Sequence, residues 1–244
     1  MNSTPLDIVL DLAEVFRERE VEDWPVRPSA VEPSEGTVAI VGRGTDRVLT
    51  PWGSEGYEFW GLNDQPRARG YAPIDCYNRW FQLHPPAYME QHYPQGLGDL
   101  KRFWGASNGI PLYMDRHYEE YPDSVPYPRD EVDSQCPLGG YHVSSFDWMV
   151  ALAVLEGWKR IELYGTDFFT FPTIMNGEPV SARPCLEYWL GVAAGRGAEI
   201  GIHQRGDLFK TIHVAVYRSE LQYGFEREPA HDLSSADSNW SDVR

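Results

Sequence analysis

The residues of this sequence that could take part in catalysis or ligand binding share one kind of position. They stand directly after short apolar runs. Such runs are typical of strands, and in a parallel sheet the carboxyl ends of the strands meet at one edge, where ligands bind. The residues at or just beyond these run ends are Gly42, Arg43, Gly44, Asn63, Asp64, His84 and Asp167. We therefore expect their side chains to converge on a single site.

The segment Gly42-Arg43-Gly44 follows the first run and favours contact with a phosphate. Glycines let backbone N–H groups approach a phosphate closely, and a guanidinium adds a charged donor. The dinucleotide fingerprint GxGxxG is not completed, because Arg47 stands where its third glycine belongs. An NAD enzyme is therefore disfavoured. A tight turn after a strand remains the alternative interpretation of the two glycines.

Asn63 and Asp64 follow the second run. An amide or a carboxylate at this position can form a hydrogen bond with a ribose or a base edge. The alternative is an Asx turn that serves only the backbone. We favour ligand contact, because the run Trp60-Gly61-Leu62 buries the backbone up to this point.

His84, His142 and Asp167 are the candidates for a general base. His84 ends the third run and is fixed by two following prolines, and an imidazole with a reference pKa of about 6.5 can accept a proton near neutral pH. Asp167 could take the proton of an acceptor hydroxyl, hold a ribose or a metal, or cap the next loop. For His84 the alternative is a structural hydrogen bond.

Ser144 and Ser145 stand at the start of an apolar helix, next to His142. Two small hydroxyls at a helix N-terminus can bind an anion together with the free N–H groups of the first turn. An N-cap role alone would explain one of the two serines. Arg183 is expected at the end of a loop over residues 168–183, where it could close over a phosphate.

The elements that must position these residues alternate between strands and helices. The apolar runs predict strands at 37–41, 57–62, 79–83, 110–114, 160–164 and 198–202, and helices around 97–104 and at 145–157 and 184–196. This alternation predicts an α/β fold, a single Rossmann-like domain over residues 37–224 with a mostly parallel sheet flanked by helices. Residues 1–36 are expected to form an N-terminal helical arm followed by a proline-rich linker. The helical arm is a candidate homo-oligomer contact. Residues 225–244 read as a polar, acidic tail.

The composition of the 244-residue chain excludes several classes of protein. Lys and Arg number 21 against 37 Asp and Glu, and the resulting charge of −16 argues against a duplex nucleic-acid partner. No stretch of 18 apolar residues is present, so no membrane span is expected. The three cysteines form no CxxC pair, which disfavours a disulfide framework and a zinc site. With no visible signal peptide, a cytoplasmic location is expected.

The stretch from Val143-Ser144-Ser145 to Gly165-Thr166-Asp167-Phe168 resembles the S(S/G)…A.A…G…I.L.G.D(F/M) segment of bacterial sialyltransferases of the Campylobacter type. It is also similar to the related MptE-like and DUF115-type proteins. In those families a first strand ends in a G.G loop and a second ends in Asn, as in Val41–Gly44 and Leu62-Asn63 here. The blocks Trp60–Asn63 and Trp80–His84 resemble those of uncharacterised proteins encoded by phages, whose location would be the host cytoplasm.

The resemblance implies a Rossmann-like sheet that binds a nucleotide. It implies that the Gly42–Gly44 loop, Asn63 and Ser144–Ser145 contact phosphate, sugar or base. One departure concerns the catalytic histidine, which these sialyltransferases carry after the strand that ends in G.D. Residues 168–197 contain no histidine here, so His84 or His142 would have to replace it.

Two classes of function follow from these observations. The first is a transferase that uses an activated nucleotide donor, in particular a nucleotide-sugar glycosyltransferase. A pyrophosphokinase is a variant of this class, and only that variant indicates a cofactor, Mg²⁺. The second is a non-catalytic module, such as a phage accessory protein, that binds a nucleotide or a protein partner.

Overall fold

The computed structural model describes residues 24–63, 72–136, 138, 140–166, 178–203 and 208–209. The predicted N-terminal helix, the polar tail, Asp64 and Asp167 lie outside the described residues. None of the described helices is long and apolar enough to cross a membrane.

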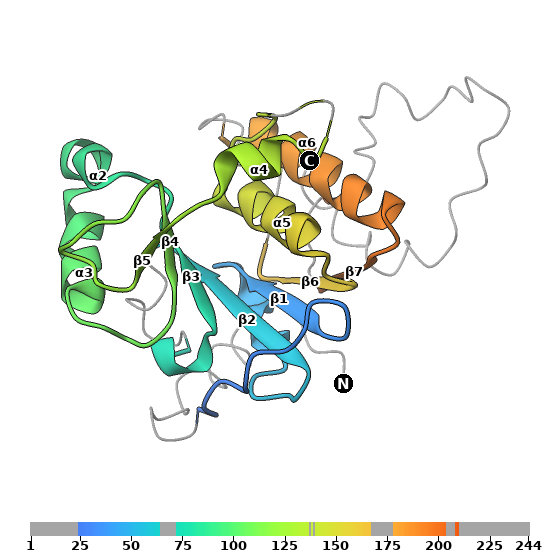
Figure 1. The fold of residues 1–244 in the computed structure, drawn as a ribbon, viewed down its shortest axis with the longest axis horizontal. Helices are drawn as coiled ribbons and strands as arrows, with labels where there is room; N and C mark the ends of the chain where they lie inside the picture. The colour runs from blue at the N-terminus through green and yellow to red at the C-terminus, as the bar shows by residue number, and fades with distance from the viewer. Residues whose placement is uncertain are drawn as a thin grey trace, which may run out of the picture. The chain divides into compact units, whose positions relative to one another are not determined.

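A seven-stranded sheet forms the centre of the described chain (Figure 1). Its strands are β1 (Thr37–Val41), β2 (Tyr57–Leu62), β3 (Arg79–Phe81), β4 (Leu112–Met114), β5 (Ser124–Pro126), β6 (Arg160–Tyr164) and β7 (Glu199–His203). Their order is β5-β4-β3-β2-β1-β6-β7, and every neighbouring pair is parallel. This confirms the predicted α/β fold class.

The central strand β1 is buried on both faces, as the apolar run that follows Thr37 predicts. Along β1, Val38 and Ile40 point to one face, and Ala39 and Val41 point to the other. Both faces are covered by helices, so a period-2 alternation of apolar and polar residues is absent from β1.

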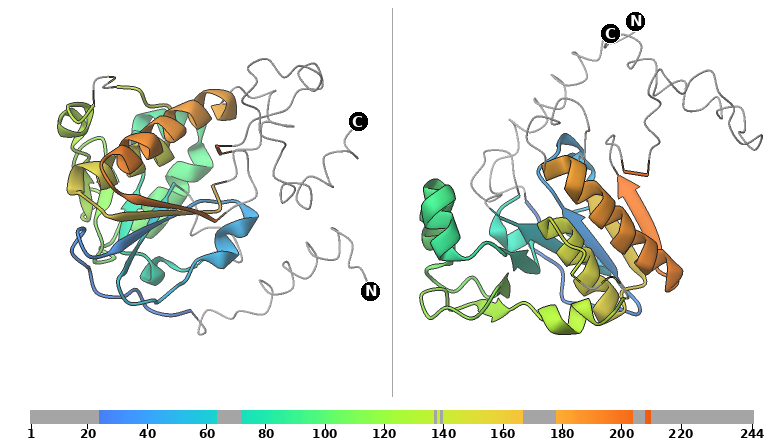
Figure 2. Two further views of the ribbon diagram at one scale, coloured as in Figure 1. Left: turned by 90° about the vertical axis from the view of Figure 1, so that its right-hand side faces the viewer. Right: turned by 90° about the horizontal axis from the view of Figure 1, so that it is seen from above.

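Two helices cover one face, and two others cover the opposite face (Figures 1 and 2). α5 (Ser145–Glu156) and α6 (Glu178–Gly195) pack side by side against the face of Val38 and Ile40. α2 (Pro86–His92) and α3 (Pro94–Trp104) cover the face of Ala39 and Val41 through Met89, Leu97, Leu100 and Trp104. Short elements complete the order: η2 (Thr45–Leu49), η4 (Ile74–Cys76) and α4 (Arg129–Asp133).

Some elements differ from the prediction. α6 begins at Glu178 rather than at residue 184, so Arg183 and Pro184 lie inside the helix. The proline therefore does not mark the first turn, although proline is favoured there. α2, α4 and β5 were not predicted, because their three to seven residues are too short to show a period.

The strand order places a topological switch point between β1 and β6. From β1 the chain adds β2, β3, β4 and β5 on one side, and it then returns to add β6 and β7 on the other side. In open parallel sheets, ligands bind outside the carboxyl ends of the two strands at such a point. Here those ends are followed by Gly42 and Gly165.

Candidate functional site at the switch point of the sheet

The loops after β1 and β6 are in direct backbone contact. The N–H of Gly42 donates to the carbonyl oxygen of Tyr164, and the N–H of Gly44 donates to that of Gly165, each at 2.7 Å. A side chain at Gly42 would overlap the carbonyl oxygen of Gly165, and one at Gly165 would lie 2.8 Å from the carbonyl oxygen of Gly44. Gly165 also has a φ of +61°, in the region that favours glycine. The close approach of the two loops therefore requires glycine.

Arg47 holds the loop after β1 in place. Its Nη1 donates to the carbonyl oxygen of Gly44 at 3.0 Å and to that of Arg43 at 3.2 Å. The Arg43 side chain itself is exposed beside this turn. The loop therefore places the exposed residue Arg43 on a backbone that the Arg47 guanidinium fixes.

Asn63 has unusual geometry at the carboxyl end of β2. Its φ of +54° lies in the left-handed region, which a non-glycine residue rarely adopts. Its backbone is held on both sides, because its N–H donates to Phe81 (2.8 Å) and its carbonyl oxygen accepts from Trp80 Nε1 (3.0 Å). Its side-chain Oδ1 is buried and accepts no hydrogen bond from the described residues. Strain and an unsatisfied polar atom in one residue are typical of functional sites.

The start of α5 reaches the same switch point. The Phe146 ring, in the first turn of α5, would lie 2.8 Å from a side chain at Gly42. Asp147, which is fully buried, fixes this turn. Its Oδ2 accepts from the N–H of Val143 (3.0 Å), the N–H of Ser144 (2.8 Å) and the hydroxyl of Ser144 (3.1 Å). Ser144 is thus the N-cap of a capping box, a structural role that the sequence left open.

His142 is enclosed by aromatic and acidic side chains, and only 1% of its side chain is exposed. Its ring stacks on Trp148 (3.5 Å between centroids) and on Trp189 (4.9 Å). Its Nδ1 donates to Asp147 Oδ1 at 3.1 Å, and its Nε2 lies 3.5 Å from Asp133 Oδ1. The imidazole therefore supports the carboxylate that holds the start of α5.

His84 follows β3, the next strand after β2 in the sheet, and is partly exposed. Its Nδ1 lies 3.0 Å from Gln82 Oε1. Tyr88 stacks on it with 5.7 Å between ring centroids, and Tyr93 lies at 6.3 Å. Because Tyr88 and Tyr93 are exposed, this edge carries an aromatic surface that can stack on a base or a sugar.

The structure places the other predicted residues as follows. Ser145 is the first residue of α5, where its N–H has no intrahelical acceptor. Arg183 lies in α6, and its Nε donates to Glu187 Oε1 at 2.7 Å. The structure thus brings Gly42, Gly44 and Gly165 together with the first turn of α5. Asn63 and His84 lie on the neighbouring strand ends.

Two residues of this site escaped the sequence analysis. Asp147 could have been recognised from the spacing of a capping box, three residues after Ser144. Arg47 was noted only because it breaks a glycine motif. No group of three metal-binding side chains occurs among the described residues.

Comparison with known proteins gives a fold likeness only. No family model and no curated protein matches the sequence. Among solved structures, the monofunctional alpha-2,3-sialyltransferase Cst-I from Campylobacter jejuni is 10% identical, with a TM-score of 0.45 over 89% of this chain and 99% of that one. The sialyltransferase CstII from the same organism, in complex with cytidine-5'-monophosphate, is 15% identical, with a TM-score of 0.44 over 70% and 80%. Because these sequence identities and TM-scores are low, the fold and the candidate site are described from the geometry of this chain alone.

Proposed function

We propose that this chain is a transferase that acts on an activated nucleotide donor, and specifically a nucleotide-sugar glycosyltransferase. The observation that supports this most is the switch point, where two glycine loops meet the first turn of α5. A polyanionic leaving group fits there, because the first-turn N–H groups and the helix dipole favour negative charge. The resemblance of the segment 143–168 to bacterial sialyltransferases supports a nucleotide-sugar donor.

The donor phosphate is expected to bind between Arg43 and the start of α5. The N–H groups of Gly42 and Gly44 already donate to carbonyl oxygens of the protein. These glycines therefore contribute close approach, while the guanidinium of Arg43 and the N–H groups of Ser145 and Phe146 contribute donors. Asn63 Oδ1, as a hydrogen-bond acceptor, suits a sugar hydroxyl or the amino group of a base.

The proposed reaction is displacement at the anomeric carbon of the donor sugar. An acceptor hydroxyl oxygen forms a bond to that carbon, and the bond from the carbon to the phosphate oxygen breaks. The acceptor proton passes to a base, and the nucleotide leaves with the bonding electrons. His84 is the proposed base, with Asp167 as the alternative, and the phosphate site stabilises the charge that develops on the nucleotide.

A thermal-shift panel of nucleotides and nucleotide sugars tests the proposal, because a ligand that binds only the native state raises the melting temperature. We expect the largest shift with a cytidine or uridine nucleotide. The shift should become smaller in Arg43→Ala, whereas Arg102→Ala, a matched change at an exposed position of α3, should keep it. A panel in which no nucleotide shifts a well-folded sample would remove the support for the site.

A non-catalytic nucleotide-binding module is the second candidate function. The burial of His142 favours this non-catalytic function, because a buried imidazole is not accessible to a substrate. Release of free sugar from the donor in the absence of acceptor would support the transferase. Binding without turnover, with or without sugar acceptors, would support the module.

A further inference from the structure

A cavity lies at the opposite edge of the sheet from the switch point. Its volume is about 760 Å³, within the range of small-molecule sites. It opens where strands β2, β3 and β4 begin and where α5 ends. The charged and aromatic residues in its lining are Arg27, Glu58, Asp75, Arg79, Tyr113 and Glu156.

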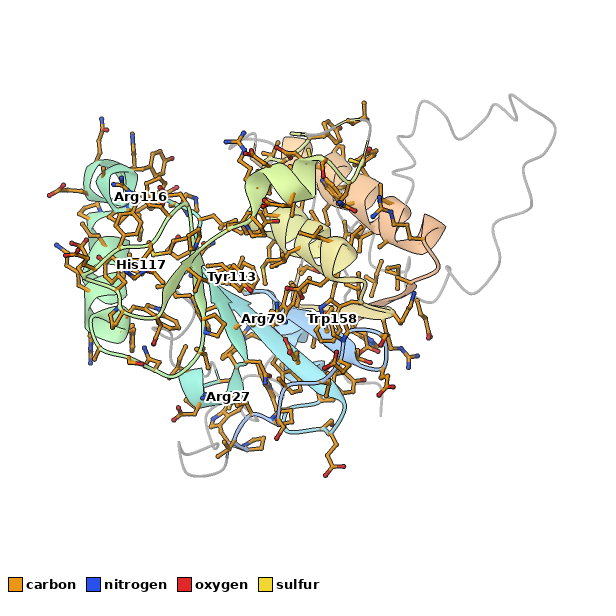
Figure 3. The ribbon with its side chains drawn as sticks, viewed as in Figure 1. Arg27, Arg79, Tyr113, Arg116, His117 and Trp158 are labelled. Atoms are coloured by element: carbon orange, nitrogen blue, oxygen red, sulfur yellow. The ribbon has the colours of Figure 1, made fainter. Side chains whose placement is uncertain are left out.

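A largely buried charge network centred on Arg79 forms one wall of this cavity. Figure 3 labels Arg79 together with Tyr113 and Trp158. Arg79 Nε lies 2.8 Å from Glu58 Oε2, and Arg79 Nη1 donates to Glu156 Oε1 at 2.5 Å. The guanidinium also lies 4.7 Å from the centroid of the Trp60 ring. Burial lowers the pKa of Arg79, but the charges of Glu58 and Glu156 outweigh this effect and raise that pKa above its ordinary value.

Two indole groups orient the carboxylates of this network. Trp60 Nε1 donates to Glu58 Oε2 at 2.9 Å, and Trp158 Nε1 donates to Glu156 Oε2 at 2.8 Å. The Glu58 side chain is only 3% exposed, whereas that of Glu156 is 23% exposed. A buried network of this kind is costly unless it is fully paired, and its placement on a cavity wall is typical of a binding site.

The cavity has an excess of negative charge. Three carboxylates line it against the two guanidinium groups of Arg27 and Arg79. Glu156 is the last residue of α5, and the last turn of that helix contains no basic residue. Because the C-terminus of a helix carries partial negative charge, the end of α5 adds to the attraction for a cation.

The rim of the cavity is built from ordered segments. The segment 26–30 is held in place by a hydrogen bond from the Arg27 N–H to the Asp75 carbonyl oxygen (2.8 Å). Asn78 Nδ2 donates to the Pro28 carbonyl oxygen at 2.9 Å. The Asp75 side chain is exposed at this rim, where it can meet an entering ligand.

We propose that this cavity binds a small organic cation, an alkylguanidinium or alkylammonium compound, and so constitutes a second ligand site on the protein. The cationic group pairs with Glu156 and Asp75, and its alkyl chain lies along the Tyr113 ring. Because the cavity and the switch point lie at opposite edges of the sheet, this site does not depend on nucleotide binding.

Calorimetric titration of the full chain with agmatine, which carries both cationic groups, tests the proposal. N-butylurea serves as the neutral analogue, and butyrate as the anionic one. We expect saturable binding of agmatine that weakens as salt is added, since salt screens charge pairs. Neither butylurea nor butyrate should bind measurably. Equal binding of butylurea, stronger binding of butyrate, or no binding of agmatine would overturn the proposal.

Two variants locate the binding in this cavity. Asp75→Asn removes an exposed rim charge without touching the buried network, and Glu156→Gln keeps an acceptor for Trp158. Each should weaken agmatine about fivefold or more, as expected for loss of one charge partner. Glu131→Gln, an exposed change in α4, should leave the affinity unchanged. If Asp75→Asn folds normally and binds agmatine as tightly as the wild type, the site lies elsewhere.

Discussion

The proposed ligand contact of Asn63 rests on two features, a left-handed backbone and a buried Oδ1 without a partner among the described residues. The sequence predicted its position after a strand, but it could not predict the backbone angle, which the contacts with Phe81 and Trp80 impose. The burial of His142 could not be predicted from the sequence either, because the ring stacks on Trp189, which is distant in the sequence. Residue roles that depend on long-range packing are thus the part that sequence patterns miss.

Replacing Asn63 by glycine separates the effect of backbone strain on stability from the effect of the side chain on nucleotide binding. Glycine adopts a φ of +54° at little cost, so Asn63→Gly should leave the melting temperature unchanged or raise it. It should also abolish the nucleotide-induced thermal shift, because Oδ1 is lost. Asn63→Ala should lose the shift and also destabilise the fold by about 1 kcal/mol. An undiminished shift in a folded Asn63→Gly protein would show that Oδ1 does not contact the nucleotide.

At the scale of elements, the strongly apolar segments were predicted best. The bounds of β1, β2 and β6 agree with the prediction, because each consists mostly of apolar or aromatic residues and lies at the centre of the sheet. α5 ends one residue earlier than predicted, at Glu156. β5 ends in Pro126 and has no apolar run, so only its pairing with β4 defines it. The interactions that hold the start of α5 are local in sequence and can be tested directly.

Asp147→Asn should destabilise the protein by about 1–3 kcal/mol, the usual penalty for leaving buried donors unsatisfied. An amide cannot accept from Val143, Ser144 and His142 as a carboxylate does, and its NH₂ group adds donors where only donors are present. Denaturant unfolding measures the loss. Asp130→Asn, an exposed change in the first turn of α4, is the control. Equal stabilities of the two variants would contradict the assigned role of Asp147.

At the scale of the whole molecule, the packed core controls when its tyrosines ionise. Burial raises the pKa of Tyr121 to about 12, and burial also raises the pKa values of Tyr127 and Tyr164 well above their ordinary range. An unfolded tyrosine loses its proton near pH 10. From there upward the unfolded state binds fewer protons than the folded state, so the free energy of unfolding must fall with rising pH.

The protein should therefore be destabilised progressively between pH 10 and about 12, with full stability from these groups below that range. Tyrosinate absorbance and circular dichroism, followed together during an alkaline titration, measure this effect. The buried tyrosines should ionise only as the circular dichroism signal is lost. Ionisation of all fourteen tyrosines near pH 10 in a protein that keeps its native signal would contradict the burial described here.

The order of the strands is a second property of the whole molecule, and it determines where the candidate site lies. The predicted alternation of strands and helices gives a parallel sheet, but it does not give the switch point between β1 and β6, which follows from the pairing of β1 with both β2 and β6. That pairing turns separate glycines at positions 42 and 165 into one candidate site. A bound nucleotide is therefore expected at the carboxyl ends of β1 and β6.

Amide hydrogen exchange with and without saturating cytidine monophosphate tests this location most directly. Binding at the switch point should slow exchange in segments 43–47, 62–63 and 143–148, because their backbone lines the carboxyl edge of the sheet. Segments 26–30 and 109–111, which border the cavity at the opposite edge, should exchange as in the free protein. Protection confined to 26–30 and 109–111, or bound nucleotide with no protection at 43–47 and 143–148, would contradict the account.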